Sequence, residues 1–325
     1  MNIIRRPRRN RANSVIRRLV QDTFLPVSKL IYPLFIIGGE SQKIEISSMP
    51  GIYRFSLDKI LKEIGECVQL GIHTFILFPV IDESLKDTTA TISYDPNNLY
   101  LKAIRSIKEK FPDIVIVTDV AMDPYNSDGH DGLVKNGEIL NDETLTILGK
   151  MAIEQAKAGA DILGPSDMMD GRIGYLREIL DNSGFKNISL MSYTAKYASS
   201  FYGPFREALD SAPKSGDKKT YQMDYNNSRD ALIEAELDTM EGADYLMVKP
   251  ALSYLDIIYK IKAVSALPVV AYNVSGEYSM IKAAGMKGWL DEERVMIEML
   301  HSIKRAGADI IITYFAKQFA RICND

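Results

Sequence analysis

The stretch Ala158–Leu163, with the sequence AGADIL, has close copies at Gly242–Leu246 (GADYL) and Ala306–Ile311 (AGADII). Each copy follows a stretch with helical periodicity and leads into an apolar run. Glycine tolerates the left-handed backbone conformation in which many helices end. Each copy therefore predicts a helix that stops at glycine and passes directly into a buried strand. Leu70–His73 is a looser copy of the same joint.

The joints lie within a longer alternation of strand-like and helix-like segments. Near-continuous hydrophobicity is typical of parallel strands that are covered on both faces. Eight runs show this pattern: Leu30–Ile37, Thr74–Val80, Ile114–Val120, Asp161–Gly164, Ile188–Tyr193, Tyr245–Val248, Pro268–Val274 and Asp309–Tyr314. Amphipathic stretches between them predict helices at Leu57–Leu70, Leu99–Lys110, Glu143–Lys157, Ser228–Glu241, Tyr254–Val264 and Glu292–Arg305. Strands that alternate with helices indicate right-handed βαβ units.

A length of 325 residues suits either two modest domains or one large α/β barrel. Eight strand–helix units favour the barrel. A doubly wound sheet would also need a glycine-rich phosphate loop, and neither GxGxxG nor GxxxxGK[ST] occurs. We therefore predict an α/β fold, a (β/α)8 TIM barrel over residues 29–325, preceded by an extended N-terminal arm over residues 1–28.

Composition limits the class of protein. With 46% hydrophobic and 25% charged residues the chain is an ordinary globular protein, and a net charge of −4 argues against a protein that coats nucleic acid. Cys67 and Cys323 are far apart, which makes a disulfide framework improbable and a reducing compartment the default. The longest apolar run, Leu30–Ile37, is too short to span a membrane. We expect a cytoplasmic protein, with an arginine-rich organelle transit peptide as the minor alternative.

Two lysines stand at the ends of neighbouring predicted strands. Lys249 follows Leu246–Val248, and Lys196 follows Ile188–Tyr193. Burial and a neighbouring cation both disfavour the protonated amine, so such lysines become nucleophiles near neutral pH. The alternative is that each lysine reaches solvent or pairs with an acid, and position alone leaves the two interpretations about even.

Other polar groups follow the strands. The long segments Asp119–Asn141 and Ala195–Asn227 leave the carboxyl ends of strands, where barrel enzymes build their active sites. The first contains four carboxylates and a histidine between Asp119 and Asp131, which suits Mg²⁺ binding or proton transfer, or equally a solvated turn. Ser275 and Tyr314 finish strands seven and eight, and their hydroxyls would either hold a carboxylate or cap a helix.

At this point the motifs resemble one family. Gly242–Tyr254 is similar to the signature of porphobilinogen synthase, also called 5-aminolevulinate dehydratase, and Met191–Arg206 resembles that family's second lysine and lid segment. The further matches are Tyr32–Phe35, Ser166–Arg172, Gly216–Gln222 and Val274–Glu277, so the resemblance covers essentially the whole chain.

The resemblance implies a lyase of haem biosynthesis without an organic cofactor, which condenses two 5-aminolevulinate molecules to porphobilinogen with loss of two waters. Lys249 and Lys196 would form Schiff bases with the first and second substrate. Ser275 and Tyr314 would bind the first carboxylate. Arg206 and Lys218, on a lid at about residues 197–225, would clamp the second carboxylate. Imine formation makes the condensation effectively intramolecular, and a lid keeps water away.

The metal requirement is where the chain departs from part of the family. Zinc-dependent members carry three cysteines where this chain has Ala121, Asp123 and Asp131. Zinc prefers thiolate and imidazole ligands, so no catalytic zinc is expected. The aspartate-rich loop resembles that of the magnesium-responsive members, in which Asp119 and Asp131 would contact the second substrate. Glu234 occupies the position of an allosteric Mg²⁺, although from the sequence alone it reads as an ordinary helix-surface glutamate.

The N-terminal arm has two interpretations. Seven arginines precede the first acidic residue, Asp22, which suits either a nucleic-acid tail or, by resemblance, an arm that wraps a neighbouring barrel in a homo-octamer. We prefer assembly, because acids outnumber bases in the rest of the chain. Besides this synthase, two other functions stay open: a Schiff-base aldolase that uses one lysine, and a barrel whose arm binds RNA.

Overall fold

The computed structural model of the chain describes residues 3–209, 214 and 216–324. Within these residues eight parallel strands close into a ring: β1 (Leu30–Ile36), β4 (Thr74–Pro79), β5 (Val115–Val120), β8 (Ile162–Pro165), β9 (Ser189–Lys196), β10 (Tyr245–Lys249), β11 (Val269–Asn273) and β12 (Ile310–Thr313). β1 pairs with β4 on one side and with β12 on the other, which completes the barrel. The predicted fold class is confirmed, and each predicted run contains one of these strands or overlaps it.

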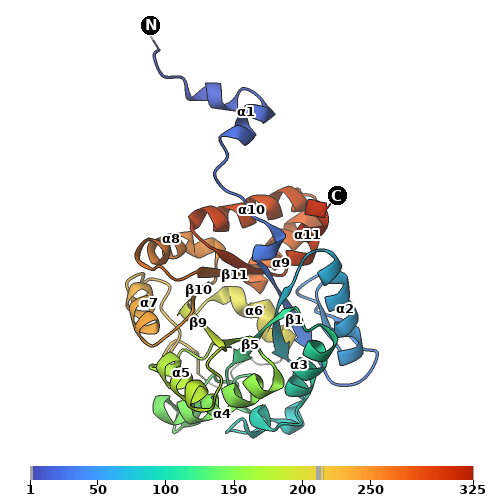
Figure 1. The fold of residues 1–325 in the computed structure, drawn as a ribbon, viewed down its shortest axis with the longest axis vertical. Coiled ribbons are helices and arrows are strands. Elements are labelled where there is room, and N and C mark those ends of the chain that lie inside the picture. Colours follow the sequence, from blue (N-terminus) through green and yellow to red (C-terminus); the bar gives the residue numbers. More distant parts are fainter. Residues whose placement is uncertain (1–2, 210–213, 215, 325) are drawn as a thin grey trace.

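Helices alternate with the strands and surround the barrel (Figure 1). They are α2 (Leu57–Gln69), α3 (Leu99–Lys110), α4 (Asn141–Ala158), α5 (Arg172–Asn182), α7 (Asp230–Met240), α8 (Leu255–Val264), α10 (Glu292–Ala306) and α11 (Ala316–Asn324). All six predicted helices are present. Of these helices, α5 and α11 were not predicted from the sequence. No helix in the described residues is long and apolar enough to cross a membrane.

The repeated Gly-Ala-Asp joints form as predicted. Gly159, Gly242 and Gly307 each have a positive φ, of 101°, 98° and 123°. The aspartates have a function that the pattern did not reveal. Asp309 Oδ2 accepts from the backbone N–H of Val269 at 2.9 Å, and Asp161 and Asp244 accept from the starts of β5 and β9 in the same way. Each joint thus fastens a new strand to its neighbour at the amino-terminal end of the barrel.

Smaller elements lie at the carboxyl-terminal end of the barrel. A hairpin of β2 (Lys43–Glu45) and β3 (Tyr53–Phe55) follows β1, and β6 (Leu133–Lys135) pairs with β7 (Glu138–Leu140) after β5. α6 (Gly203–Leu209) lies in the segment after β9, and α9 (Ser275–Met286) follows β11. Ser275 therefore begins a helix rather than finishing a strand.

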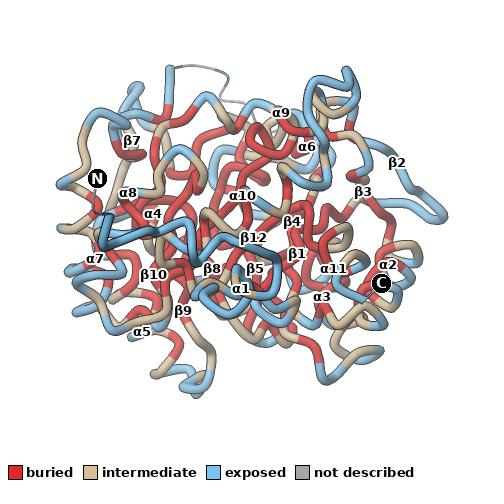
Figure 2. Tube along the Cα trace, turned by 90° about the horizontal axis from the view of Figure 1, so that it is seen from above, coloured by how far each residue is buried: buried red, intermediate tan, exposed pale blue. Residues whose placement is uncertain are grey.

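The predicted arm extends away from the barrel and carries the short helix α1 (Ser14–Leu19) (Figure 1). Buried residues concentrate in the barrel strands, whereas the arm is exposed along nearly its whole described length (Figure 2). Residues 1–2 of the predicted arm, residues 210–213 and 215 of the predicted lid, and the last residue of the predicted barrel lie outside the described residues.

Candidate active site

Lys196 and Lys249 are the last residues of β9 and β10 and pair directly across the two strands. β9 reaches Lys196, beyond its predicted end at Tyr193, and its register with β10 shifts between Leu246 and Val248. Both lysines are only 5% exposed. The alternative that the two lysines reach solvent is therefore wrong, whereas the alternative of an acid partner holds for Lys196, which lies close to Asp131.

The amine of Lys249 lies in an aromatic cage. Among the described residues, the ring centroids of Tyr272, Phe205, Tyr193 and Tyr202 lie 4.7, 4.9, 5.1 and 5.2 Å from Nζ. Burial, reinforced by the charge of Lys196, lowers the pKa of Lys249 to about 7. A large fraction of this amine is therefore neutral and nucleophilic near pH 7.

The amine of Lys196 lies in a more polar setting. It donates a hydrogen bond to the backbone carbonyl of Ser166 and lies 3.9 Å from Asp131 Oδ1. The Tyr193 ring lies 5.7 Å from Lys196 Nζ and so lies near both amines. The two lysines are thus adjacent but electrostatically distinct, because among the described residues only Lys196 of the two has a carboxylate, Asp131, within ion-pair distance.

Three aspartates lie beside the lysines. Lys218 Nζ is 3.0 Å from Asp131 Oδ2 and 3.2 Å from Asp123 Oδ2. Burial would raise the pKa of Asp131, but Lys196 and Lys218 outweigh it and lower that pKa to about 2. Burial and the charge of Asp123 instead raise the pKa of Asp119 to about 7. Asp131 is therefore a fixed anion, whereas Asp119 exchanges a proton near neutral pH.

The segment after β9 covers these groups. A cavity of about 30 Å³ lies beneath it, lined by Asp123, Lys196, Tyr202, Phe205, Arg206, Lys218, Gln222 and Lys249. The cavity brings together four predicted site residues: the two lysines, Arg206 and Lys218. Its volume holds a water molecule or two but no larger ligand. The cavity in this arrangement is therefore too small for a larger ligand.

Ser275 and Tyr314 lie beside this cavity rather than in its lining. Ser275 Oγ accepts from the backbone N–H of Phe205 at 3.0 Å and donates to the carbonyl of Phe201. The hydroxyls of Tyr314 and Tyr272 lie 3.0 Å apart, and the Tyr272 ring belongs to the cage around Lys249. Both hydroxyls are thus placed around the Lys249 side of the site.

The sequence analysis missed the aromatic members of the cage. Tyr202 donates to the backbone carbonyl of Lys249 at 3.0 Å, and the Phe205 ring packs edge-on against Phe78. The available signal was the cluster of aromatic residues just before Arg206. Aromatic residues within a predicted lid are candidates for closing it over an apolar floor.

Glu234 lies away from this site, on α7. Burial raises its pKa to about 7; Arg172 opposes the shift, and Asp238, Asp170 and Glu241 add to it. Among the described residues no three His, Cys, Asp or Glu side chains come together in an arrangement that could hold a metal ion.

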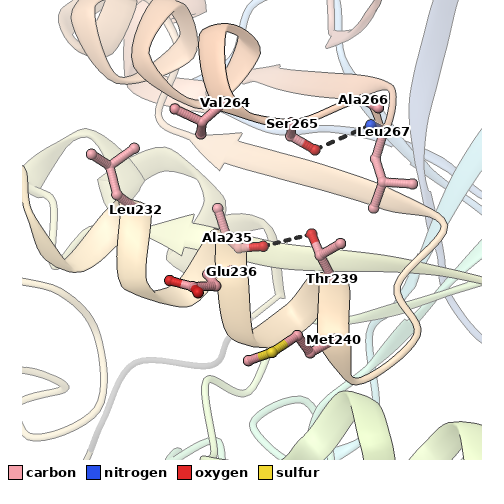
Figure 3. A pocket seen from close by; sticks show the side chains of 9 residues that line it. All are labelled: Leu232, Ala235, Glu236, Thr239, Met240, Val264, Ser265, Ala266 and Leu267. Carbon is pink, nitrogen blue, oxygen red and sulfur yellow. Dashed lines mark hydrogen bonds between the residues drawn. The ribbon is translucent and has the colours of Figure 1, made fainter.

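A second hollow of about 540 Å³ lies on the outside of the barrel (Figure 3). α7 forms one wall with Leu232 and Met240, the turn from α8 to β11 forms the other with Val264 and Leu267, and Glu236 is the acid among the lining residues. No predicted catalytic or substrate-binding residue lines it. It is a surface groove and not a part of the lysine site.

Comparison with known proteins identifies relatives over the whole fold. A sequence model of the delta-aminolevulinic acid dehydratase family matches residues 4–322. The chain is 55% identical to chloroplastic delta-aminolevulinic acid dehydratase 1 of Arabidopsis thaliana, over 98% of this chain and 75% of that protein. It is 52% identical to the enzyme of Synechocystis sp., over 98% of both. Delta-aminolevulinic acid dehydratase (porphobilinogen synthase) of Toxoplasma gondii, solved with the product porphobilinogen, superposes with a TM-score of 0.97 at 53% identity, covering 98% of this chain and 92% of that one.

The same relatives correct one expectation. The sequence analysis expected a cytoplasmic protein, but relatives from Arabidopsis thaliana, Oryza sativa, Glycine max and Spinacia oleracea are named as chloroplastic enzymes. The cytoplasmic expectation is therefore wrong. It rested on composition and on the lack of an apolar signal, and neither feature distinguishes the cytoplasm from the interior of a plastid.

Proposed function

The chain belongs to the delta-aminolevulinic acid dehydratase family, and we propose that Lys249 and Lys196 carry the reaction of this family. The enzyme is a lyase of haem biosynthesis that condenses two molecules of 5-aminolevulinate to porphobilinogen with loss of two waters. It requires no organic cofactor. The observation that supports the two-lysine proposal most strongly is the direct pairing of two buried lysines at the carboxyl ends of β9 and β10.

The first substrate would bind at Lys249. The neutral amine attacks the ketone, the carbinolamine loses water, and a protonated imine remains as an electron sink. Ser275 and Tyr314 would hold the carboxylate of this substrate. Their hydroxyls now bond to Phe201 and Tyr272, so binding would exchange these partners for the carboxylate.

The second substrate would bind at Lys196. Arg206 lines the cavity and carries a cation to meet the substrate carboxylate. Lys218 would join it, and this requires that it leave Asp123 or Asp131. Asp119, with a pKa near neutrality, would accept a proton during ring formation, and Asp131 would stay ionised beside Lys196.

Residues 197–225 would act as a lid. Phe205 contributes a ring to the cage over Lys249, and the cavity beneath the segment is too small for either substrate. Opening would admit two 5-aminolevulinate molecules, and closure would exclude water from the imines.

We propose that the enzyme belongs to the magnesium-responsive type and has no catalytic zinc. Asp123 and Asp131 stand where zinc-dependent members have cysteines, and both pair with Lys218. Glu234 would hold an allosteric Mg²⁺, largely through water. When bound, the ion would offset the negative charge that this face of α7 shares with Asp170 and Glu241.

We propose further that the arm assembles the chain into a homo-octamer. Several of its apolar side chains are exposed, with Ile4 84% and Leu19 82% exposed. The groove of Figure 3 combines apolar walls with Glu236, which suits an arm of apolar residues and arginines from a second copy. By analogy with the chloroplastic relatives, we propose a plastid as the compartment.

The proposed function is tested by a colorimetric assay for porphobilinogen from 5-aminolevulinate, with and without Mg²⁺. The account predicts turnover that Mg²⁺ increases. A Schiff-base aldolase would instead keep its turnover after Lys196→Ala, because it needs a single imine.

A further inference from the structure

A chain of buried polar side chains connects the carboxyl ends of β11 and β12. Thr313 Oγ1 donates to Asn273 Oδ1 at 2.8 Å, and Asn273 Nδ2 donates to Glu277 Oε2 at 2.9 Å. Asn273 and Thr313 are the last residues of their strands and pair directly in register. All three side chains have an exposure of 0%, so these bonds are shielded from competing water.

Glu277 extends this connection to β10. Its Oε1 accepts from the backbone N–H of Leu252 at 2.7 Å, in the turn that follows Lys249. Its Oε2 also accepts from the backbone N–H of Val274 at 3.0 Å. The carboxylate therefore receives hydrogen bonds from two separate strand ends and one side chain. An ionised carboxylate only accepts hydrogen bonds, so it is well suited to a site where its hydrogen-bonding partners are N–H donors.

The strand ends joined in this way are those that carry the proposed site of the first substrate. Leu252 lies three residues after Lys249, Val274 directly precedes Ser275, and Thr313 directly precedes Tyr314. A shift of Glu277 would therefore alter the spacing of an amine and two hydroxyls that must act on one substrate molecule.

Burial of the Glu277 carboxyl group carries an electrostatic penalty that a side chain serving only to fill space would not have. Burial raises the pKa of Glu277 to about 7, although its hydrogen bonds to Asn273, Val274 and Leu252 oppose the shift. Apolar side chains of similar volume would fill the same space without this electrostatic penalty. They could not accept from the turn after Lys249 and from Asn273 at the same time.

We propose that Glu277, with Asn273 and Thr313, is a positioning unit that sets the spacing of Lys249, Ser275 and Tyr314 without touching the substrate. The inference rests on the proposed function, since it assumes that these three residues act on one 5-aminolevulinate. Because misplacement by 1 Å costs on the order of 10²-fold in rate, a small loss of register is measurable.

The test uses Glu277→Gln, which keeps the volume but removes one acceptor oxygen. We expect the rate of adduct formation at Lys249, measured by borohydride trapping in a single turnover, to fall at least about tenfold. The KM for 5-aminolevulinate should rise by a matching factor. Asp309→Asn is the matched control. Asp309 also joins β12 to β11, through Val269, but at the opposite end of the barrel. It should lower the thermal midpoint and leave the adduct rate of folded enzyme within about twofold.

Two further variants extend the test, and the first of them keeps it decisive if Glu277→Gln fails to fold. Thr313→Val removes the bond from Thr313 to Asn273, together with the bond that Thr313 Oγ1 accepts from the backbone N–H of Phe315, and should slow adduct formation in the same direction. Asn273→Asp combined with Glu277→Gln restores the bond between these residues with donor and acceptor exchanged, and should recover part of the lost rate. A wild-type adduct rate in Glu277→Gln, or in Thr313→Val if Glu277→Gln does not fold, would overturn the proposal, as would no recovery in a folded double variant. Absence of the Lys249 adduct in the unmodified enzyme would instead contradict the proposed function itself.

Discussion

Lys196 and Lys249 are direct cross-strand neighbours at the carboxyl ends of β9 and β10. Their amines share the Tyr193 ring, yet only Lys196 has a carboxylate, Asp131, within ion-pair distance among the described residues. Lys249 is instead surrounded by aromatic rings and has its pKa lowered to about 7. This asymmetry predicts that Lys249 reacts first as a nucleophile.

The first prediction concerns pH. Only the neutral amine attacks a ketone, so the rate of adduct formation at Lys249 should rise with pH through about 7. Lys196→Met removes the neighbouring cation, which raises the pKa of Lys249 and moves this midpoint to higher pH. Borohydride trapping with peptide mass spectrometry across the pH range measures both. A midpoint that stays in place in the variant would show that Lys196 does not tune Lys249.

The second prediction concerns the contact between α9 and the lid. A Cβ on Gly276 would lie 2.5 Å from the backbone oxygen of Phe201, a distance that requires the backbone to move. Gly276→Ala should lower the free energy of unfolding by roughly 1–3 kcal/mol and raise KM, because Phe201 belongs to the covering segment. Gly203→Ala is the control, since nothing lies within 4 Å of its added methyl group. Equal thermal midpoints and KM values in the two variants would contradict this packing.

Sequence patterns predicted the barrel well because each strand–helix unit is determined by a short local pattern, and that pattern recurs along the chain. Each near-continuous apolar run indicated one strand, and each glycine-terminated periodic stretch indicated one helix of the barrel. Gly159, Gly242 and Gly307 adopt the expected left-handed conformation. The pairing partners of Lys218 and the cage around Lys249 were not predictable in this way. They depend on side chains that lie far apart in the chain, such as Asp123 with Lys218 and Tyr272 with Phe205. Strand-end position and then the motif resemblance identified the candidate lysines, whereas their protonation depends on tertiary burial.

The third prediction concerns Glu234 and magnesium. The folded-state pKa of Glu234 is raised from 4.5 to about 7, so the unfolded chain loses its proton first and the stability associated with this group falls as pH rises between these values. Glu234→Gln should therefore raise the thermal midpoint at pH 8 relative to the parent enzyme without metal. It should also abolish the increase in activity on adding Mg²⁺, whereas Glu236→Gln on the same helix should retain it.

A related control separates the metals. A zinc-selective chelator should leave turnover unchanged, since Asp123 and Asp131 are ion-paired to Lys218 and offer no thiolate. Loss of turnover that zinc alone restores would contradict both the magnesium-responsive type and the proposed place of Lys218.

The fourth prediction concerns assembly. Deletion of residues 1–28 removes seven arginines and the exposed side chains of Ile4 and Leu19. Light scattering coupled to size-exclusion chromatography should show the parent enzyme as an octamer and the shortened enzyme as a smaller species. An unchanged mass would show that the arm has no role in assembly.

The most direct test of the two-lysine account is identification of the residues that borohydride traps with isotope-labelled 5-aminolevulinate. The account predicts a reduced adduct on Lys249 at low substrate, a second adduct on Lys196 as the substrate concentration rises, and loss of porphobilinogen formation by at least about 10³-fold in either lysine-to-methionine variant. Porphobilinogen formation at the normal rate without any adduct on Lys249 would contradict it.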